Sequence, residues 1–280
     1  MAAGVRSRAH RRPNVVGGLA GFAWLLVVIV PVYYVVITSL RDQEGFFSSN
    51  PLVPPEEPTL DSYRLVLEND FLRYLGNSVV VTLATVAITV TVSLLAAYYV
   101  VRADTRFSRL TYRSFLLGLA IPLQATIIPV YYLIVQAQLY DTLLAIILPS
   151  AAFAIPLTVV ILANFLRDVP GELFESMRLD GAGHWRVVWS LVLPLTRPAV
   201  VTVAVYDALQ VWNGFLFPLI LTQSPDQRLL PLALWSFQGQ FTVNIPAVLA
   251  AVVLSTLPVL ALYILGRRQL VSGLTAGFSR

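Results

Sequence analysis

The stretch Arg167-Asp-Val-Pro-Gly-Glu-Leu-Phe-Glu-Ser-Met-Arg-Leu-Asp-Gly-Ala-Gly-His-Trp-Arg186 is polar, and long apolar runs lie on both sides of it. Pro170 can begin a helix within it, because the missing N–H of a proline would be unpaired at that position anyway. Glu172 then falls in the first turn, where the helix dipole favours an acid, and Gly181 is a natural helix stop. We therefore predict a short helix of about three turns between two apolar segments.

This predicted helix is amphipathic, and a second short helix is expected from His184 to Leu193, ending before Pro194. The apolar face of the first helix carries Leu173, Phe174 and Met177, and the polar face carries Glu172, Glu175 and Arg178. Such a helix beside a membrane either lies among the lipid headgroups or docks onto a soluble partner. Composition alone favours neither interpretation.

The composition is that of an integral membrane protein. Of the 280 residues, 57% are hydrophobic and 12% are charged, whereas a soluble domain carries about 25% charged residues. The chain has no cysteine, which excludes a disulfide framework and a thiolate metal site. All 19 basic residues are arginines, and they are scattered between the apolar runs, which argues against a nucleic-acid partner.

Six apolar runs are long enough to cross a bilayer, which takes ~20 residues. The runs cover residues 15–40, 76–101, 114–135, 142–166, 199–222 and 246–265. They are too long for barrel strands and lack the alternation of such strands. The first run follows a basic start at residues 1–14 but has no small-residue cleavage site after it, so we expect an uncleaved span. The prediction is a single all-α domain with six transmembrane helices.

The arginines predict the orientation of this domain. Fifteen of the 19 lie in the N-terminal segment, the turn with Arg102 and Arg113, the 167–197 loop and the 266–280 tail. Because arginine is enriched on the cytoplasmic side, both termini and the 167–197 loop are expected to be cytoplasmic.

No residue pattern for catalysis is present. The sequence has no Gly-x-x-x-x-Gly-Lys loop and no lysine that could serve a nucleotide. His10 and His184 are single histidines, and His184 is expected at the surface. No serine forms a recognisable catalytic pattern with a histidine and an aspartate. We therefore predict no catalytic residue, no metal site and no cofactor bound by this chain.

Asp207 is the only acid in a predicted span, where an unpaired charge costs roughly 3 kcal/mol or more. It could have a structural role, near the membrane interface or hydrogen-bonded within the bundle. It could also face a wet pathway, because Tyr206, Gln210 and Asn213 share a helical face with Asp207 at its edge and Trp212 beside it. Carboxylate, amide and aromatic groups together would suit a polyol solute.

The central stretch resembles the "EAA" loop of binding-protein-dependent ABC importer permeases. That family pattern is Glu-Ala-Ala, three residues, Gly, and about nine residues to a hydrophobic-Leu-Pro. The matching residues here are Glu175-Ser-Met-Arg-Leu-Asp180-Gly181-Ala182 and then Leu193-Pro194-Leu195. Ser176 and Met177 replace the two alanines of the pattern, and both fit a helix.

Further motifs extend this resemblance from about residue 32 to residue 277, toward the second, maltose-type inner-membrane permease subunit. They are Ile121-Pro122, Ile128-Pro129, Asp141-Thr142, Trp212-Asn213-Gly214-Phe215 with Pro218-Leu219, and Leu270-Val-Ser-Gly273-Leu274-Thr275-Ala276-Gly277. The resemblance implies a carbohydrate importer in a bacterial cell membrane. It also implies a second homologous permease, two copies of a cytosolic ATPase that bind ATP and Mg²⁺, and an extracytoplasmic solute-binding protein.

The same resemblance implies roles for individual residues. Contact with the ATPase would involve Glu172, Glu175, Ser176, Met177, Asp180, Gly181, Ala182, Gly183 and Pro194. The tail residues Gly273, Leu274, Thr275 and Gly277 would reach toward the ATPase dimer. The candidate substrate-pathway residues come instead from the shared helical face described above, and they are Tyr206, Asp207, Gln210, Trp212 and Asn213.

Three other functions stay open at this point. A glycerol-3-phosphate-type importer would want a cationic pathway, and no arginine lies in a predicted span. An ion-coupled secondary transporter could use Asp207, but such transporters typically carry internal repeats, which are not visible here. A scaffold that only anchors cytosolic partners is the third.

Overall fold

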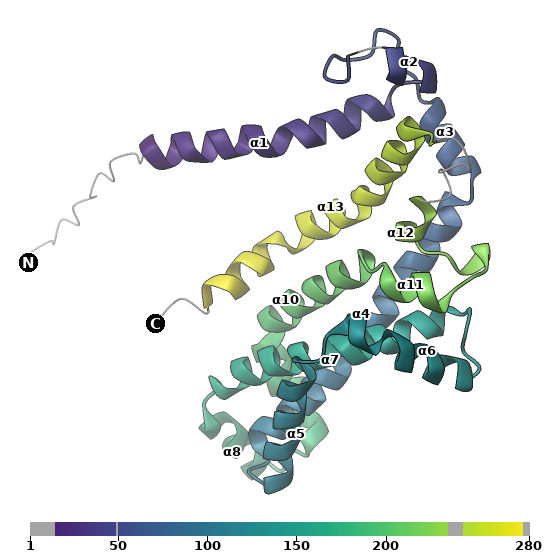
Figure 1. The fold of residues 1–280 in the computed structure, drawn as a ribbon. Helices are drawn as coiled ribbons and strands as arrows, with labels where there is room; N and C mark the ends of the chain where they lie inside the picture. Colours follow the sequence, from purple (N-terminus) through teal and green to yellow (C-terminus); the bar gives the residue numbers. More distant parts are fainter. Residues whose placement is uncertain (1–14, 49, 235–242, 277–280) are drawn as a thin grey trace, which may run out of the picture.

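The computed structural model describes residues 15–48, 50–234 and 243–276, with side chains as far as residue 264. The described residues form helices and connecting turns, with no sheet among them (Figure 1). The helices are α1 Val15–Ser39, α2 Gln43–Ser48, α3 Asp61–Glu68, α4 Phe71–Arg102, α5 Arg106–Gly118, α6 Ile127–Gln136, α7 Leu143–Arg167, α8 Gly171–Leu179, α9 His184–Val187, α10 Leu193–Trp212, α11 Leu216–Leu221, α12 Leu230–Ala233 and α13 Ile245–Ala276.

Five helical stretches of the described chain are long and apolar enough to cross a membrane, and one bent pair of helices could supply a sixth crossing. The all-helical fold agrees with the prediction. The bundle is centred on α4, which packs against α7 and α10, while α10 also contacts α7 and α13. The apolar helix α1 packs against α13 and leaves most of its side chains exposed. Figure 1 places α8 and α5 at one end of the molecule and α2 and α3 at the other.

The third predicted span, residues 114–135, is not one straight helix. It is a pair, α5 and a 3₁₀ turn leading into α6, bent by 99°. Pro122 explains the break, because it lacks an N–H and disfavours the helical conformation in the residue before it. The predicted basic turn is also helical, since α5 begins at Arg106 after a capping box between Thr105 and Ser108.

Two further predictions have the wrong boundaries. They are the fifth span, predicted at residues 199–222, and the short helix expected to end before Pro194. One helical run of 29 residues extends from His184 to Trp212. A π-helical segment, Val188–Val192, joins α9 to α10, and the Leu193 N–H bonds to the Val188 carbonyl. The wider π turn accommodates the proline that follows it. The run ends at Trp212, and α11 is a separate short helix.

The remaining boundaries differ less. The second span, predicted at 76–101, starts earlier, at Phe71, because Asp70 adopts a left-handed turn (φ 57°) before it. The sixth, predicted at 246–265, continues to Ala276, so the segment 266–276 is helical. The loops expected at 41–73 and 223–245 hold α2, α3 and α12.

Two links hold the turns at the α3 end together. Asp141, between α6 and α7, accepts hydrogen bonds from the backbone N–H groups of Gln223 (2.8 Å) and Ser224 (3.0 Å) and from the Ser224 hydroxyl. On the other side, Arg73 of α4 forms an ion pair with Asp226. The segment that follows α11 is therefore fixed to both α4 and the α6–α7 turn.

The Asp141 link predicts a pH-dependent stability. The Ser224 hydroxyl, then the N–H groups of Gln223 and Ser224, hold the pKa of Asp141 below its usual 3.8, against a smaller opposing effect of burial. Because the pKa is lowered in the folded state, the link stabilises the protein above pH ~4 and is lost as the pH falls through the lowered value. We expect Asp141→Asn to unfold a few degrees below the parent protein at pH 7, and this gap to be narrower at pH 3, which lies below the ordinary pKa of 3.8.

Thermal unfolding of the detergent-purified parent protein and of Asp141→Asn, each at pH 7 and pH 3, measures this difference. Asp104→Asn is the control, because the Arg109–Asp104 pair lies away from these turns and is 58% and 92% exposed, and exposed pairs contribute little. A gap between the parent and Asp141→Asn that is the same at both pH values would contradict the link.

Candidate functional site

The predicted amphipathic helix is α8, and its C-terminal end has a specific backbone cap. The Ala182 N–H bonds to the Met177 carbonyl (2.9 Å) and the Gly181 N–H to the Arg178 carbonyl (3.0 Å). This is the Schellman pattern, which requires a left-handed residue, and Gly181 has φ +76°. The predicted stop at Gly181 is confirmed. At the other end Pro170 is the cap residue and Gly171 the first helical residue, one position later than predicted.

One aromatic side chain fixes α8 to the bundle. Phe174 is 1% exposed and packs in a cluster with residues of α4, α7 and the π-helical segment. Its ring stacks on Tyr98 at a centroid distance of 6.4 Å, and the Arg102 guanidinium lies 4.0 Å from the ring centroid. A cation over an aromatic face contributes about 0.5–2 kcal/mol beyond the buried area. The end of α4 therefore holds α8 in place.

The opposite side of α8 is exposed and mixed in character. Glu172, Glu175 and Leu179 all face outward, and Leu179 is 89% exposed. Two tryptophans that follow α8, Trp185 and Trp189, are 66% and 62% exposed. Several exposed apolar side chains among charges mark a surface that contacts another protein or the membrane.

The other predicted coupling residues lie around this surface. Ser176 is exposed and its hydroxyl bonds to the Leu173 carbonyl, while Met177 and Ala182 pack against the Phe174 cluster. Asp180, Gly183 and Pro194 are exposed. His184 is exposed as predicted, and its Nδ1 is 3.1 Å from the Tyr98 hydroxyl.

The predicted tail contacts receive no side-chain description. Gly273, Leu274 and Thr275 lie on the last turns of α13, in the part where only the backbone is described, and Gly277 lies outside the described residues.

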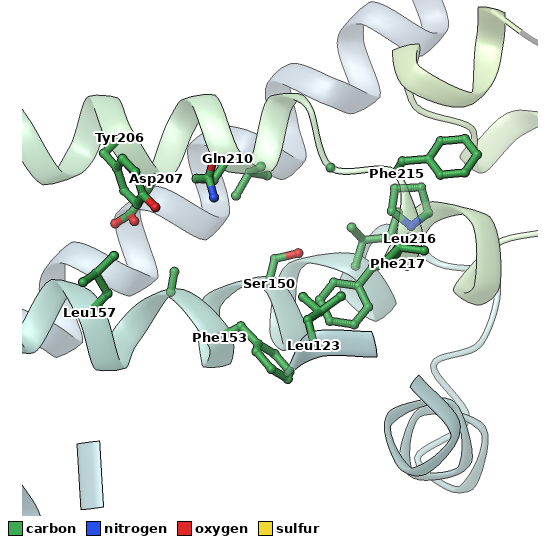
Figure 2. Close-up of a pocket in the computed structure, with 15 residues that line it drawn as sticks. Leu123, Ser150, Phe153, Leu157, Tyr206, Asp207, Gln210, Phe215, Leu216 and Phe217 are labelled. Carbon is green, nitrogen blue, oxygen red and sulfur yellow. The ribbon is translucent and has the colours of Figure 1, made fainter. Parts of the chain in front are cut away.

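A cavity of about 390 Å³ opens between α7, α10 and α11 (Figure 2). Both helix breaks border it: Leu123 comes from the turn after α5, and the segment from Gly214 to Pro218 connects α10 with α11. In transporters, interrupted helices commonly mark the solute site, because irregular backbone is tolerated in a membrane where it lines a cavity. Figure 2 shows Asp207 and Gln210 pointing from α10 toward α7, which carries Ser150.

The structure brings together only part of the predicted pathway set. Tyr206, Asp207 and Gln210 line the cavity. Trp212 instead packs against the cluster of α3, α4, α12 and α13 residues. Asn213 ends α10, and its amide donates to the Leu209 carbonyl (2.8 Å). The helical stride used for the prediction ends at this break, so Asn213 does not continue the face.

Asp207 is 2% exposed, and its Oδ2 accepts a hydrogen bond from the Thr158 hydroxyl on α7 at 3.0 Å. This bond joins α7 to α10, so the structural role considered for Asp207 has a visible partner. The same side chain also lines the cavity.

Sequence reasoning missed the groups that α7 and α4 contribute. Ser150 and Phe153 line the cavity from α7, and Tyr98 and Arg102 of α4 contact α8. Pro149 and Pro156 flank the first pair along the chain, which is the one signal that marks this part of α7. Among the described residues, no group of three His, Asp or Glu side chains is placed to hold a metal ion.

The fold matches a solved transporter. The crystal structure of a bacterial ABC transporter involved in the import of the acidic polysaccharide alginate superposes with a TM-score of 0.82, covering 95% of this chain and 99% of that chain at 19% identity. At this identity the likeness shows that the two chains share a fold.

The sequence comparisons define the family. The family model for the binding-protein-dependent transport system inner membrane component matches residues 69–271. The chain is 29% identical to the diacetylchitobiose uptake system permease protein NgcG of Streptomyces coelicolor, over 92% of this chain and 86% of that protein. It is 27% identical to the glucose import system permease protein GlcU of Saccharolobus solfataricus, over 90% of each. The chain belongs to the binding-protein-dependent transport system inner membrane components. It is a multi-pass membrane permease, as the resemblance predicted.

Because Phe174 is buried, its replacement should destabilise the protein far more than replacement of an exposed residue of α8. Phe174→Ala removes a buried ring and leaves a cavity, which typically costs 3–5 kcal/mol. Leu179→Ala is the matched control on the same helix, because Leu179 is 89% exposed and surface changes stay within about 0.5 kcal/mol.

Chemical unfolding of the purified protein compares the two variants. We expect a much lower midpoint for Phe174→Ala and an unchanged one for Leu179→Ala. Equal midpoints would show that α8 is not anchored by this ring.

Proposed function

We propose that this chain is half of the translocation pathway of a carbohydrate ABC importer, and that α8 transmits the movement of a separate cytosolic ATPase. The observation that carries the proposal is the position of α8: it is anchored through Phe174 and exposes a mixed polar and apolar face at one end of the bundle. The permease family and the absence of a nucleotide loop from the sequence support a separate source of energy.

The connection between α8 and the cavity supports mechanical coupling. The run from His184 to Trp212 begins five residues after α8 ends and carries the cavity residues Tyr206, Asp207 and Gln210. Because a packed helix moves as a rigid body, a displacement of α8 reaches the cavity wall through this run. Closure of the ATPase pair would in this way alternate the side on which the cavity opens.

The cavity supports a carbohydrate as cargo. Its polar groups, Ser150, Gln210 and Asp207, can exchange hydrogen bonds with hydroxyls, and the aromatic rings of Phe153 and Phe217 form an apolar wall. Two relatives are named for uptake of a sugar, diacetylchitobiose and glucose. A phosphate solute would need cationic groups, and none of the side chains that line the cavity is basic.

The partners and the orientation belong to the same proposal. We expect a homologous second permease, two ATPase subunits that bind ATP and Mg²⁺, and a solute-binding protein outside, with both termini and α8 in the cytoplasm of a bacterial cell. The arginine distribution supports this orientation. The tail residues Gly273, Leu274, Thr275 and Gly277 would approach the ATPase.

Charge reversal on α8 tests the coupling role. Glu175 lies on the exposed face of α8 and does not line the cavity, so Glu175→Arg should leave the fold intact. It should weaken ATPase binding by about tenfold or more, because it replaces a negative charge at the proposed interface with a positive one. The measurement is recovery of the ATPase with the affinity-purified permease, together with solute uptake.

Glu68→Arg is the matched control, because Glu68 is an exposed glutamate of α3 at the opposite end. Normal ATPase recovery and uptake with Glu175→Arg would remove α8 from the coupling role. Uptake by the reconstituted chain without any ATPase would instead favour an ion-coupled transporter.

A further inference from the structure

We propose that Asp207 makes the cavity selective by charge, so that it admits neutral and cationic saccharides and excludes anionic ones. This inference rests on the proposed function, because it assigns a cargo class to the same cavity. Its starting point is that, among the described residues, a single carboxylate side chain lines this largely apolar space.

The hydrogen bonding of Asp207 leaves one oxygen for a ligand. Oδ2 accepts the Thr158 hydroxyl at 3.0 Å, whereas Oδ1 has no partner among the described residues. The side chain is 2% exposed and lines the cavity. Oδ1 is not among the fully buried polar atoms that lack a partner, and Asp207 lines the cavity, so this oxygen can accept a hydrogen bond from a ligand or pair with a positive charge there.

No basic group in the cavity offsets this carboxylate. The lining residues include no Arg or His, and each ion pair found in the described chain lies elsewhere. The arginine that precedes Asp207 on α10 is Arg197, ten residues earlier, which corresponds to about 15 Å along a helix. In an apolar surrounding the field of one charge is strong and poorly screened.

The other side chains that line the cavity can bind a saccharide that lies next to the Asp207 carboxylate. A sugar hydroxyl or the ammonium group of an amino sugar can donate to Oδ1. The Gln210 amide and the Ser150 hydroxyl, which lie on facing helices, can donate to and accept from neighbouring hydroxyls. A carboxylate, sulfonate or phosphate on the sugar would instead be repelled. The preferred cargo class is therefore a neutral or amino saccharide.

The sequence allows a direct test, because the chain contains no cysteine. Ser150→Cys places a single thiol in the cavity. In the purified complete importer, this thiol is treated with three methanethiosulfonate reagents of similar size: the cationic trimethylammonium-ethyl, the anionic sulfonatoethyl and a neutral reagent. Modification of this chain is followed by intact mass, and each rate is divided by the rate of the same reagent with free mercaptoethanol.

We expect the normalised cationic rate to exceed the anionic rate by about fivefold or more. Adding Asp207→Asn to Ser150→Cys should bring the ratio close to one while leaving the neutral rate unchanged. Adding Asp207→Glu, which keeps the charge, should preserve the ratio. Thr158→Val with Ser150→Cys should also preserve it, because it removes the hydrogen bond but not the carboxylate.

Two results would overturn the inference. One is a normalised ratio near one in the Ser150→Cys protein, which would show that Asp207 carries no effective charge toward the cavity or that another subunit cancels it. The other is a failure of even the neutral reagent to react, with and without nucleotide, which would show that the cavity is not on a water-filled path. Either result can occur while the ATPase still binds to α8, so it is distinguishable from failure of the coupling role.

Discussion

The contact between the Phe174 ring and the end of α4 is the interaction on which the rest of the structure depends. Nine residues of α8 are too few to hold a helix in water by themselves. Stacking on Tyr98, the Arg102 guanidinium over the ring and burial against α7 make α8 part of the bundle. Without this anchor, a force applied to the exposed face of α8 would bend a loop and would not move the transmembrane helices.

The second constraint is the contrast between continuous and interrupted helices. The run from His184 to Trp212 absorbs Pro194 through a π-helical segment, so it stays connected from the α8 end to the cavity. In contrast, α5 and α6 are bent by 99°, and α10 stops before α11. The cavity lies where these two breaks meet α7. In the proposed mechanism, the unbroken run transmits motion and the two broken elements surround the solute.

The sequence predicted the parts that depend on local chemistry. The length and hydropathy of the apolar runs gave the helices, and Gly181 gave the end of α8, because few other residues accept its φ of +76°. The prediction from the sequence was wrong where tertiary contacts determine the structure. Whether Pro122 or Pro194 breaks a helix depends on the packing around it and on the turn before it. Trp212 points away from Gln210 because it packs against a cluster on another face of α10. Ser150 and Tyr98 carry no distinctive motif, and only tertiary structure brings them to the cavity and to α8.

The central claim, that α8 is the surface through which a cytosolic ATPase moves this permease, is tested most directly by labelling one position. Leu179→Cys gives a single exposed thiol in a chain without native cysteines. A membrane-impermeant maleimide is applied to inside-out and right-side-out vesicles, with the ATPase present or stripped away. The account predicts labelling only in inside-out vesicles without the ATPase, and protection when it is rebound. Labelling in right-side-out vesicles, or labelling that the ATPase does not change, would contradict it.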